Sequence, residues 1–187
     1  MLKSKNIELV PFEPKYIKKF VEFRNSEDSR NFLMPGIPYP VTEVSVSEWF
    51  SKRANPNESG EFAIIYNETK EYIGNISYGN VDWKNRHCEI AVMIGEERYR
   101  NRGLGSEAII TLLDFIFNEL NLHRVELKVY DFNDRAIKSY EKCGFKKEGL
   151  LREAVYKHGR YINEWIMGII KDEFLERNFQ GNNSNNT

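Results

Sequence analysis

The sequence has few cysteines, no long apolar run and no obvious leader. Cys88 and Cys143 are its only two cysteines, and their spacing fits no metal-binding motif, so neither a disulfide framework nor a cysteine-based metal site is expected. No apolar stretch approaches the roughly 20 residues that a transmembrane helix needs. Residues 1–6 lack the apolar region of a secretion signal. These absences predict a cytoplasmic protein that does not enter the membrane.

The sequence also has almost no net charge. Its 27 basic and 28 acidic residues give a formal charge of −1, so no global field favours nucleic acid or an anionic membrane surface as a partner. The three histidines, His87, His123 and His158, share no spacing typical of a metal site. We therefore expect no nucleic acid, membrane or metal partner. Any basic feature that matters must be local.

Strand-like and helix-like segments alternate along the 187 residues, a length usual for one domain. Apolar patterning predicts strands at 7–12, 62–66, 72–78, 89–94, 123–129, 145–156 and 161–171, and helices at 15–25, 42–53, 108–116 and 134–142. Residues 28–39 are proline-rich and predict a surface loop. The pattern predicts a layered α/β fold, with one domain over 1–175 and a disordered tail over 176–187.

The most informative stretch is a basic, glycine-containing turn between a strand and a helix. We call residues 100–106 the arginine–glycine turn. Gly103 and Gly105 let the backbone approach a ligand closely, and the first turn of the helix presents N–H groups at the positive end of its macrodipole. Three arginines surround this turn: Arg98, Arg100 and Arg102. Such a turn is typical of a phosphate-binding site.

Two other interpretations of this turn are open. Gly103-x-Gly105-x-x-Ala108 also fits a dinucleotide-binding fingerprint, with Glu126 near the place of its ribose-binding acid. The eight residues 95–102 separate the strand from the first glycine, and Glu126 lies in the middle of a predicted strand, so this alternative is disfavoured. The glycines alone are equally compatible with an ordinary loop that carries solvated arginines.

A second helix carries the other half of the pattern. Asn133 is suited to cap a helix that begins at Asp134, and Gly144 stands where such helices commonly end. Asn133 and Tyr140 are seven residues apart, which is about two helical turns. Both side chains are therefore expected on one face, directed towards the phosphate site.

These segments together resemble the acetyl-CoA-binding core of the GCN5-related N-acetyltransferases (GNAT). The resemblance rests on Arg100-x-x-Gly103-x-Gly105, followed by Asn133-x-x-Ala136-x-x-x-Tyr140-x-x-x-Gly144-Phe145. Residues 149–153 and 163–167 are similar to the branch of that superfamily that contains ribosomal-protein alanine acetyltransferases and spermidine acetyltransferases. The resemblance implies a single GNAT-type domain with a mixed, mostly antiparallel central sheet flanked by helices.

The resemblance also implies acetyl-CoA as co-substrate and a set of residues that contact it. This set comprises Val92, Met93, Ile94, Arg100, Asn101, Arg102, Gly103, Leu104, Gly105, Ser106, Asn133 and Ala136. A backbone N–H near Met93 would stabilise the oxyanion if the strand is splayed there. The diphosphate is expected on the backbone of residues 102–106.

Two side chains are candidates for proton transfer. Tyr140 matches the general acid of the family, and a phenol that titrates near 10 suits a departing thiolate whose thiol titrates near 8.5. An ordinary core tyrosine on an amphipathic helix is the alternative. Glu89 is the candidate general base, acting directly or through water, although a solvated strand residue would look the same. No nucleophilic Ser or Cys motif is present, which favours direct attack by the amine.

The amine acceptor is the least determined part of the prediction. A protein or peptide N-terminus is expected, with a polyamine or an amino sugar as the alternative. Glu22, Glu27 and Asp28 offer acidic groups that would attract a polyamine, but a solvated helix face contains the same residues. A non-catalytic module that senses CoA is the alternative from a different class. The resemblance also raises the option of a homodimer.

Overall fold

The structure of the protein, a computed structural model, describes residues 1–33, 36–52, 55 and 57–183. The chain forms two compact units. The first unit contains residues 1–81 and 90–112, and the second contains residues 82–89 and the chain from Leu113 onward. Strand β5 (His87–Ile94) and helix α4 (Leu104–Asn118) contribute residues to both units.

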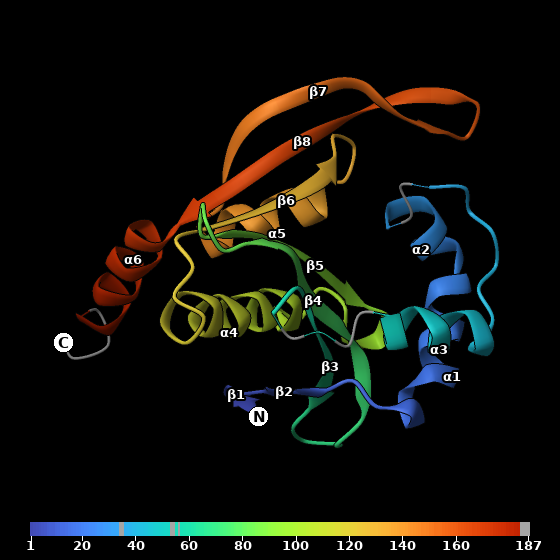
Figure 1. Ribbon diagram of the computed structural model, residues 1–187, viewed down its shortest axis with the longest axis horizontal. Helices are drawn as coiled ribbons and strands as arrows, with labels where there is room; N and C mark the ends of the chain where they lie inside the picture. Colours follow the sequence, from blue (N-terminus) through green and yellow to red (C-terminus); the bar gives the residue numbers. More distant parts are fainter. Residues whose placement is uncertain (34–35, 53–54, 56, 184–187) are drawn as a thin grey trace. The chain divides into compact units, whose positions relative to one another are not determined.

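The first unit holds most of the N-terminal elements. Its strands are β1 (Leu2–Lys3), β2 (Ile7–Pro11), β3 (Gly60–Tyr66), β4 (Tyr72–Asp82) and the second part of β5. Its helices are η1 (Pro14–Tyr16), α1 (Ile17–Asn25), α2 (Glu27–Phe32), α3 (Glu43–Lys52), η2 (Glu97–Tyr99) and the first part of α4. Strands β1 to β4 pair in sequence order, with antiparallel β1–β2, β2–β3 and β3–β4 ladders, and α1 lies beside α3 (Figure 1).

Apolar periodicity explains how this unit packs. Alternation in β2 buries Ile7 and Leu9 fully, while the intervening Glu8 stays half-buried. In α1, Phe20 and Phe23 are three residues apart and face one core, which also contains Met93 from β5. Burial of each large apolar side chain contributes roughly 1.5–3 kcal/mol to folding. This core therefore anchors β5 just ahead of the arginine–glycine turn.

The second unit contains the C-terminal strands and helices. They are β6 (Arg124–Tyr130), α5 (Asp134–Cys143), β7 (Lys146–Lys157), β8 (Arg160–Ile170) and α6 (Lys171–Asn183). The first part of β5 pairs parallel to β6, β6 pairs antiparallel to β8, and β8 pairs antiparallel to β7. Figure 1 shows β7 and β8 as a long two-stranded hairpin. The predicted mixed, mostly antiparallel sheet with helices is confirmed.

Two segments differ from the sequence-based prediction. Residues from Glu27 to Phe32 form helix α2 where a loop from residue 28 was expected, because the Ser26 side chain accepts a hydrogen bond from the Ser29 N–H and caps the helix. The part of that loop at residues 34–35 lies outside the described residues. Helix α6 extends to Asn183, where a tail beginning at 176 was expected, and its Phe174 packs 5.3 Å from the ring of Phe117. Residues 184–187 lie outside the described residues.

Candidate functional site

The arginine–glycine turn has the backbone geometry of an anion-binding loop. Asn101 has φ of 59° and Gly103 has φ of +79°, both in the left-handed region, where glycine fits with little strain. Helix α4 begins directly afterwards at Leu104. The first N–H groups of an α-helix have no partner within the helix. The turn therefore directs these donors, together with the positive end of a 15-residue helix, at one place.

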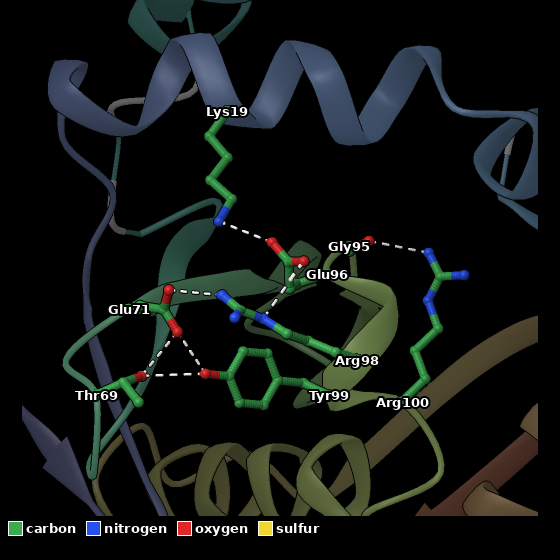
Figure 2. A network of polar contacts seen from close by, with 8 residues as sticks. All are labelled: Lys19, Thr69, Glu71, Gly95, Glu96, Arg98, Tyr99 and Arg100. Carbon is green, nitrogen blue, oxygen red and sulfur yellow. Dashed lines mark hydrogen bonds and ion pairs between the residues drawn. The ribbon is translucent and has the colours of Figure 1, made fainter.

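Two of the three arginines around the turn already have partners in the first unit. Arg98 forms ion pairs with Glu71 at 2.6 Å and with Glu96 at 3.6 Å. The Arg100 guanidinium donates to the carbonyl oxygens of Ile94, at 3.0 Å, and Gly95, at 2.9 Å, and also pairs with Asp28. Figure 2 shows these two side chains directed to opposite sides of the loop. Arg100 thus fastens the turn to the end of β5.

Arg102 has a different environment. Among the described residues it forms no ion pair, and its Nη2 lies 3.4 Å from the Tyr66 hydroxyl. Its guanidinium carbon lies 5.4 Å from the ring centroids of both Tyr66 and Tyr99. Contacts with aromatic faces hold the side chain in place without neutralising its charge. Of the three arginines, Arg102 is therefore the one whose charge is available to a ligand.

A hydrogen-bonded network supports the segment that precedes the turn (Figure 2). The Glu71 carboxylate accepts hydrogen bonds from the Tyr99 and Thr69 hydroxyls, and the latter is 2.9 Å long. The hydrogen bond from Tyr99 and that from Thr69 lower the pKa of Glu71 below its ordinary value. Lys19 of α1 pairs with Glu96 at 2.9 Å. These contacts fix η2 and, with it, the entry to the arginine–glycine turn.

The backbone is irregular where β5 ends. The N–H groups of Gly95 and Glu96 both donate to the carbonyl oxygen of Ile73, at 2.9 and 3.2 Å. Two successive donors on one acceptor interrupt a regular ladder, as in a β-bulge. A Cβ atom at Gly74 would lie 2.0 Å from the Met93 carbonyl oxygen, so only glycine permits this close approach. The irregularity thus lies just beyond Met93, the residue whose neighbourhood was expected to supply an oxyanion donor.

Helix α5, in the second unit, has the capping expected from sequence. The Asn133 side chain accepts a hydrogen bond of 3.2 Å from the Ala136 N–H, and Gly144 has φ of 102°. Tyr140 packs edge-on against Phe145 at 5.9 Å. Burial, and then the neighbouring Cys143, raises the pKa of Tyr140 to about 12. The phenol is therefore protonated throughout the neutral pH range, as a proton donor must be.

Glu89 lies on the part of β5 that belongs to the second unit. It lies opposite Glu126 in the parallel β5–β6 ladder, is half-buried, and forms no hydrogen bond or ion pair with another described residue. Glu126 is paired with Arg124 at 3.1 Å. The buried Cys88 is unsuited to nucleophilic attack, because burial raises the pKa of its thiol to about 12. Of the two carboxylates in this ladder, Glu126 is thus held by an arginine and Glu89 is not.

Comparison with known proteins identifies the family. The model of the acetyltransferase (GNAT) domain matches residues 6–146. The chain belongs to the GNAT acetyltransferase family. It is 34% identical over 139 residues to the uncharacterised N-acetyltransferase p20 of Bacillus licheniformis, covering 72% of this chain and 78% of that protein. It is 29% identical over 154 residues to the spermidine N(1)-acetyltransferase of Vibrio cholerae, covering 82% and 88%.

A solved structure agrees with this assignment. The crystal structure of spermidine N-acetyltransferase from Vibrio cholerae in complex with CoA and spermine has a TM-score of 0.84 to this chain at 25% identity. The match covers 92% of this chain and 99% of the other. The resemblance found in the sequence and the predicted GNAT fold are thus confirmed. The protein is an N-acetyltransferase that uses acetyl-CoA as co-substrate.

The GNAT residues predicted from sequence fall into two groups. Val92–Ile94 and the arginine–glycine turn belong to the first unit, where a Cβ atom at Gly105 would lie 3.6 Å from the Ile94 side chain. Glu89, Asn133, Ala136 and Tyr140 belong to the second unit. Sequence reasoning missed the supporting residues of the first group: Asp28, Tyr66, Thr69, Glu71 and Tyr99. No local motif marks them, because most of them come from other elements.

Two further properties concern the described part of this GNAT chain. No group of three or more His, Cys, Asp or Glu residues there has the arrangement of a metal site. No helix there is both long enough and apolar enough to span a bilayer. The predicted domain limits of 1–175, a homodimer and a cytoplasmic location stay predictions.

Proposed function

We propose that this enzyme acetylates a primary amine of a polyamine such as spermidine. The observation that carries the proposal is the match over 92% of the chain, at a TM-score of 0.84, to a spermidine acetyltransferase whose structure holds CoA and spermine. The relative from Vibrio cholerae with 29% identity has the same named activity. These likenesses favour a polyamine over the protein N-terminus that was expected from sequence.

The arginine–glycine turn fits the diphosphate of acetyl-CoA. Apart from Gly103 itself and its two neighbours in the chain, no described residue has an atom within 4 Å of the place where a Cβ would stand at Gly103, so the backbone is open to a ligand there. The N–H groups at the start of α4 and the guanidinium of Arg102 supply donors and positive charge. Arg100 was expected to contact the cofactor, but its donors to Ile94 and Gly95 favour a role in holding the turn.

Transfer proceeds by direct attack of a neutral amine on the thioester carbon. The C–N bond forms, the C–S bond breaks, and the thiolate takes a proton from Tyr140. The proton lost by the amine passes to Glu89, directly or through water. Because the phenol of Tyr140, with a pKa of about 12, is a weaker acid than a thiol near 8.5, it donates only once the C–S bond is breaking. Proton transfer from Tyr140 to the thiolate is therefore less favourable than it would be from a phenol with the ordinary pKa near 10.

An acceptor screen with Tyr140→Phe tests the proposal. Thiol release would be followed with acetyl-CoA and spermidine, an N-terminal peptide or an amino sugar. We expect spermidine to give the highest kcat/KM, and Tyr140→Phe to lower kcat by about 10²–10⁴-fold, the usual contribution of general acid catalysis. Binding of CoA, measured by calorimetry, should stay within about twofold, since the phenyl ring retains the packing of Tyr140.

Three outcomes would contradict parts of this proposal. Faster acetylation of the peptide than of spermidine would overturn the acceptor class. Unchanged kcat in Tyr140→Phe would remove the role of the phenol. Binding of CoA without turnover of any amine would favour the module that senses CoA.

A further inference from the structure

Glu164 on β8 is a half-buried carboxylate. It forms no hydrogen bond or ion pair with another described residue. Burial raises its pKa, the positive charge of Lys128 opposes the rise, and the negative charge of Glu89 adds to it. Lys128 is exposed and acts on Glu164 without forming an ion pair. Glu89 and Glu164 are thus two carboxylates of the second unit that repel each other, and neither forms an ion pair with a cation among the described residues.

Tyr130 on β6 is the strand neighbour of Glu164. It lies directly opposite Glu164 in the antiparallel β6–β8 ladder, where opposed Cα atoms are about 4.5–5.5 Å apart. The side chain is only 4% exposed, and its hydroxyl has no hydrogen-bond partner among the described residues. Burial, and then the negative charge of Glu164, raises the pKa of Tyr130.

An orphaned buried hydroxyl is unusual in a folded protein. Leaving such a group without a partner disfavours folding, and native proteins keep few of them. The ring of Tyr130 is held by Phe132, stacked at 5.5 Å, while the Lys157 ammonium lies 5.2 Å from its centroid, over the ring face. These contacts explain why the ring is buried, but they give the hydroxyl oxygen no hydrogen-bond partner among the described residues. A ligand that donates a hydrogen bond to this oxygen would supply one.

We propose that Glu164 and the Tyr130 hydroxyl bind a protonated amine of the polyamine acceptor, one that is not the reacting amine. This inference rests on the proposed function. The reacting nitrogen must be neutral, whereas the other nitrogens of a polyamine resemble the lysine amine and stay charged near neutral pH. An ammonium group has donors for both a carboxylate and a hydroxyl oxygen. Its charge also relieves the repulsion between Glu89 and Glu164.

Glu164→Gln tests the assignment, because it removes the charge and keeps the shape. Spermidine would be titrated calorimetrically into the full-length enzyme saturated with CoA, and KM for spermidine would be measured in parallel. We expect both Kd and KM for spermidine to rise about tenfold or more, the usual effect of losing a hydrogen bond to a charged group. The Kd for CoA should not change. Glu153→Gln, an exposed glutamate on β7, is the matched control and should behave as wild type.

Tyr130→Phe separates binding from structure. Removing the orphaned hydroxyl should leave the melting temperature unchanged or raise it, while the affinity for spermidine falls. A lower melting temperature with unchanged spermidine affinity would show a merely structural role and overturn the part assigned to Tyr130.

The remaining outcomes distinguish this inference from the proposed function. Spermidine affinity in Glu164→Gln within twofold of wild type would overturn the inference, even if wild type acetylates spermidine rapidly. Propylamine, which has no second amine, should bind equally to wild type and Glu164→Gln, and an equal loss for both amines would also overturn it. If wild type binds spermidine through Glu164 but acetylates no amine, the binding site stands and the proposed function falls.

Discussion

At the residue scale, the three arginines around the turn carry the same charge but have different partners. Arg98 is neutralised by Glu71 and Glu96, and Arg100 by Asp28, whereas Arg102 rests on aromatic rings. An exposed ion pair such as that of Arg98 contributes little to stability. The three arginines therefore differ in whether their positive charge is available to bind a diphosphate.

Substitution of these arginines should therefore have unequal effects on CoA binding. We expect Arg102→Ala to weaken CoA binding about tenfold or more, since it removes a charge-assisted contact to phosphate. The weakening should shrink as salt is raised. Arg98→Ala is the matched control and should bind CoA within about twofold of wild type. Calorimetric titration with CoA at two salt concentrations measures the affinities. Equal losses of CoA affinity in the two variants would contradict the distinction between Arg102 and Arg98.

At the element scale, helix α5 is delimited by two local signals. The Asn133 side chain caps its first turn, and Gly144 ends it in the left-handed conformation. Asn133 is also almost fully buried and belongs to the residues expected to contact the cofactor. One side chain thus has two candidate roles, which substitution can separate.

Asn133→Ala should lower the free energy of unfolding by about 1 kcal/mol, the usual effect of losing an N-cap. Asn133→Ser keeps a capping oxygen and should stay close to wild type in stability. Urea unfolding measures both. If KM for acetyl-CoA rises in Asn133→Ser although stability is retained, the side chain contacts the cofactor as well. Equal stability of the alanine variant and wild type would contradict the capping role.

At the scale of the whole molecule, contacts distant in sequence hold the N-terminal segment to helix α4. The Glu107 carboxylate accepts hydrogen bonds from the Ser4 hydroxyl and the Asn6 N–H, each 2.6 Å long. Burial opposes ionisation of Glu107, but these hydrogen bonds outweigh it and lower its pKa below the ordinary 4.5. The charged form of Glu107 therefore stabilises the fold.

The lowered pKa of Glu107 in the folded protein predicts that stability depends on pH. Because the pKa of Glu107 is lower in the folded than in the unfolded state, its contribution is present above about pH 4.5 and is lost as the pH falls through the folded value. Glu107→Gln should therefore melt at a lower temperature than wild type at pH 7, and the difference should shrink in acid. Exposed Glu119→Gln is the control. A gap that is constant from pH 7 to pH 3 would contradict the assignment.

The sequence alone determined the features that depend on neighbours along the chain. The cap at Asn133 and the helix end at Gly144 could be predicted because each depends on a few consecutive residues. The alternation of apolar residues likewise predicted most strands. The family pattern then joined these local signals into a predicted acetyl-CoA site.

The tertiary structure alone decided which side chains remain available for chemistry. Asp28 and Glu71 occupy Arg100 and Arg98 from other elements, and the β6–β8 register sets Glu164 opposite Tyr130. Helix α2 and the length of α6 were also not predicted from the sequence. The physical reason is that hydrogen bonds, ion pairs and desolvation depend on distances in space, and residues remote in sequence fix those distances only when the chain folds.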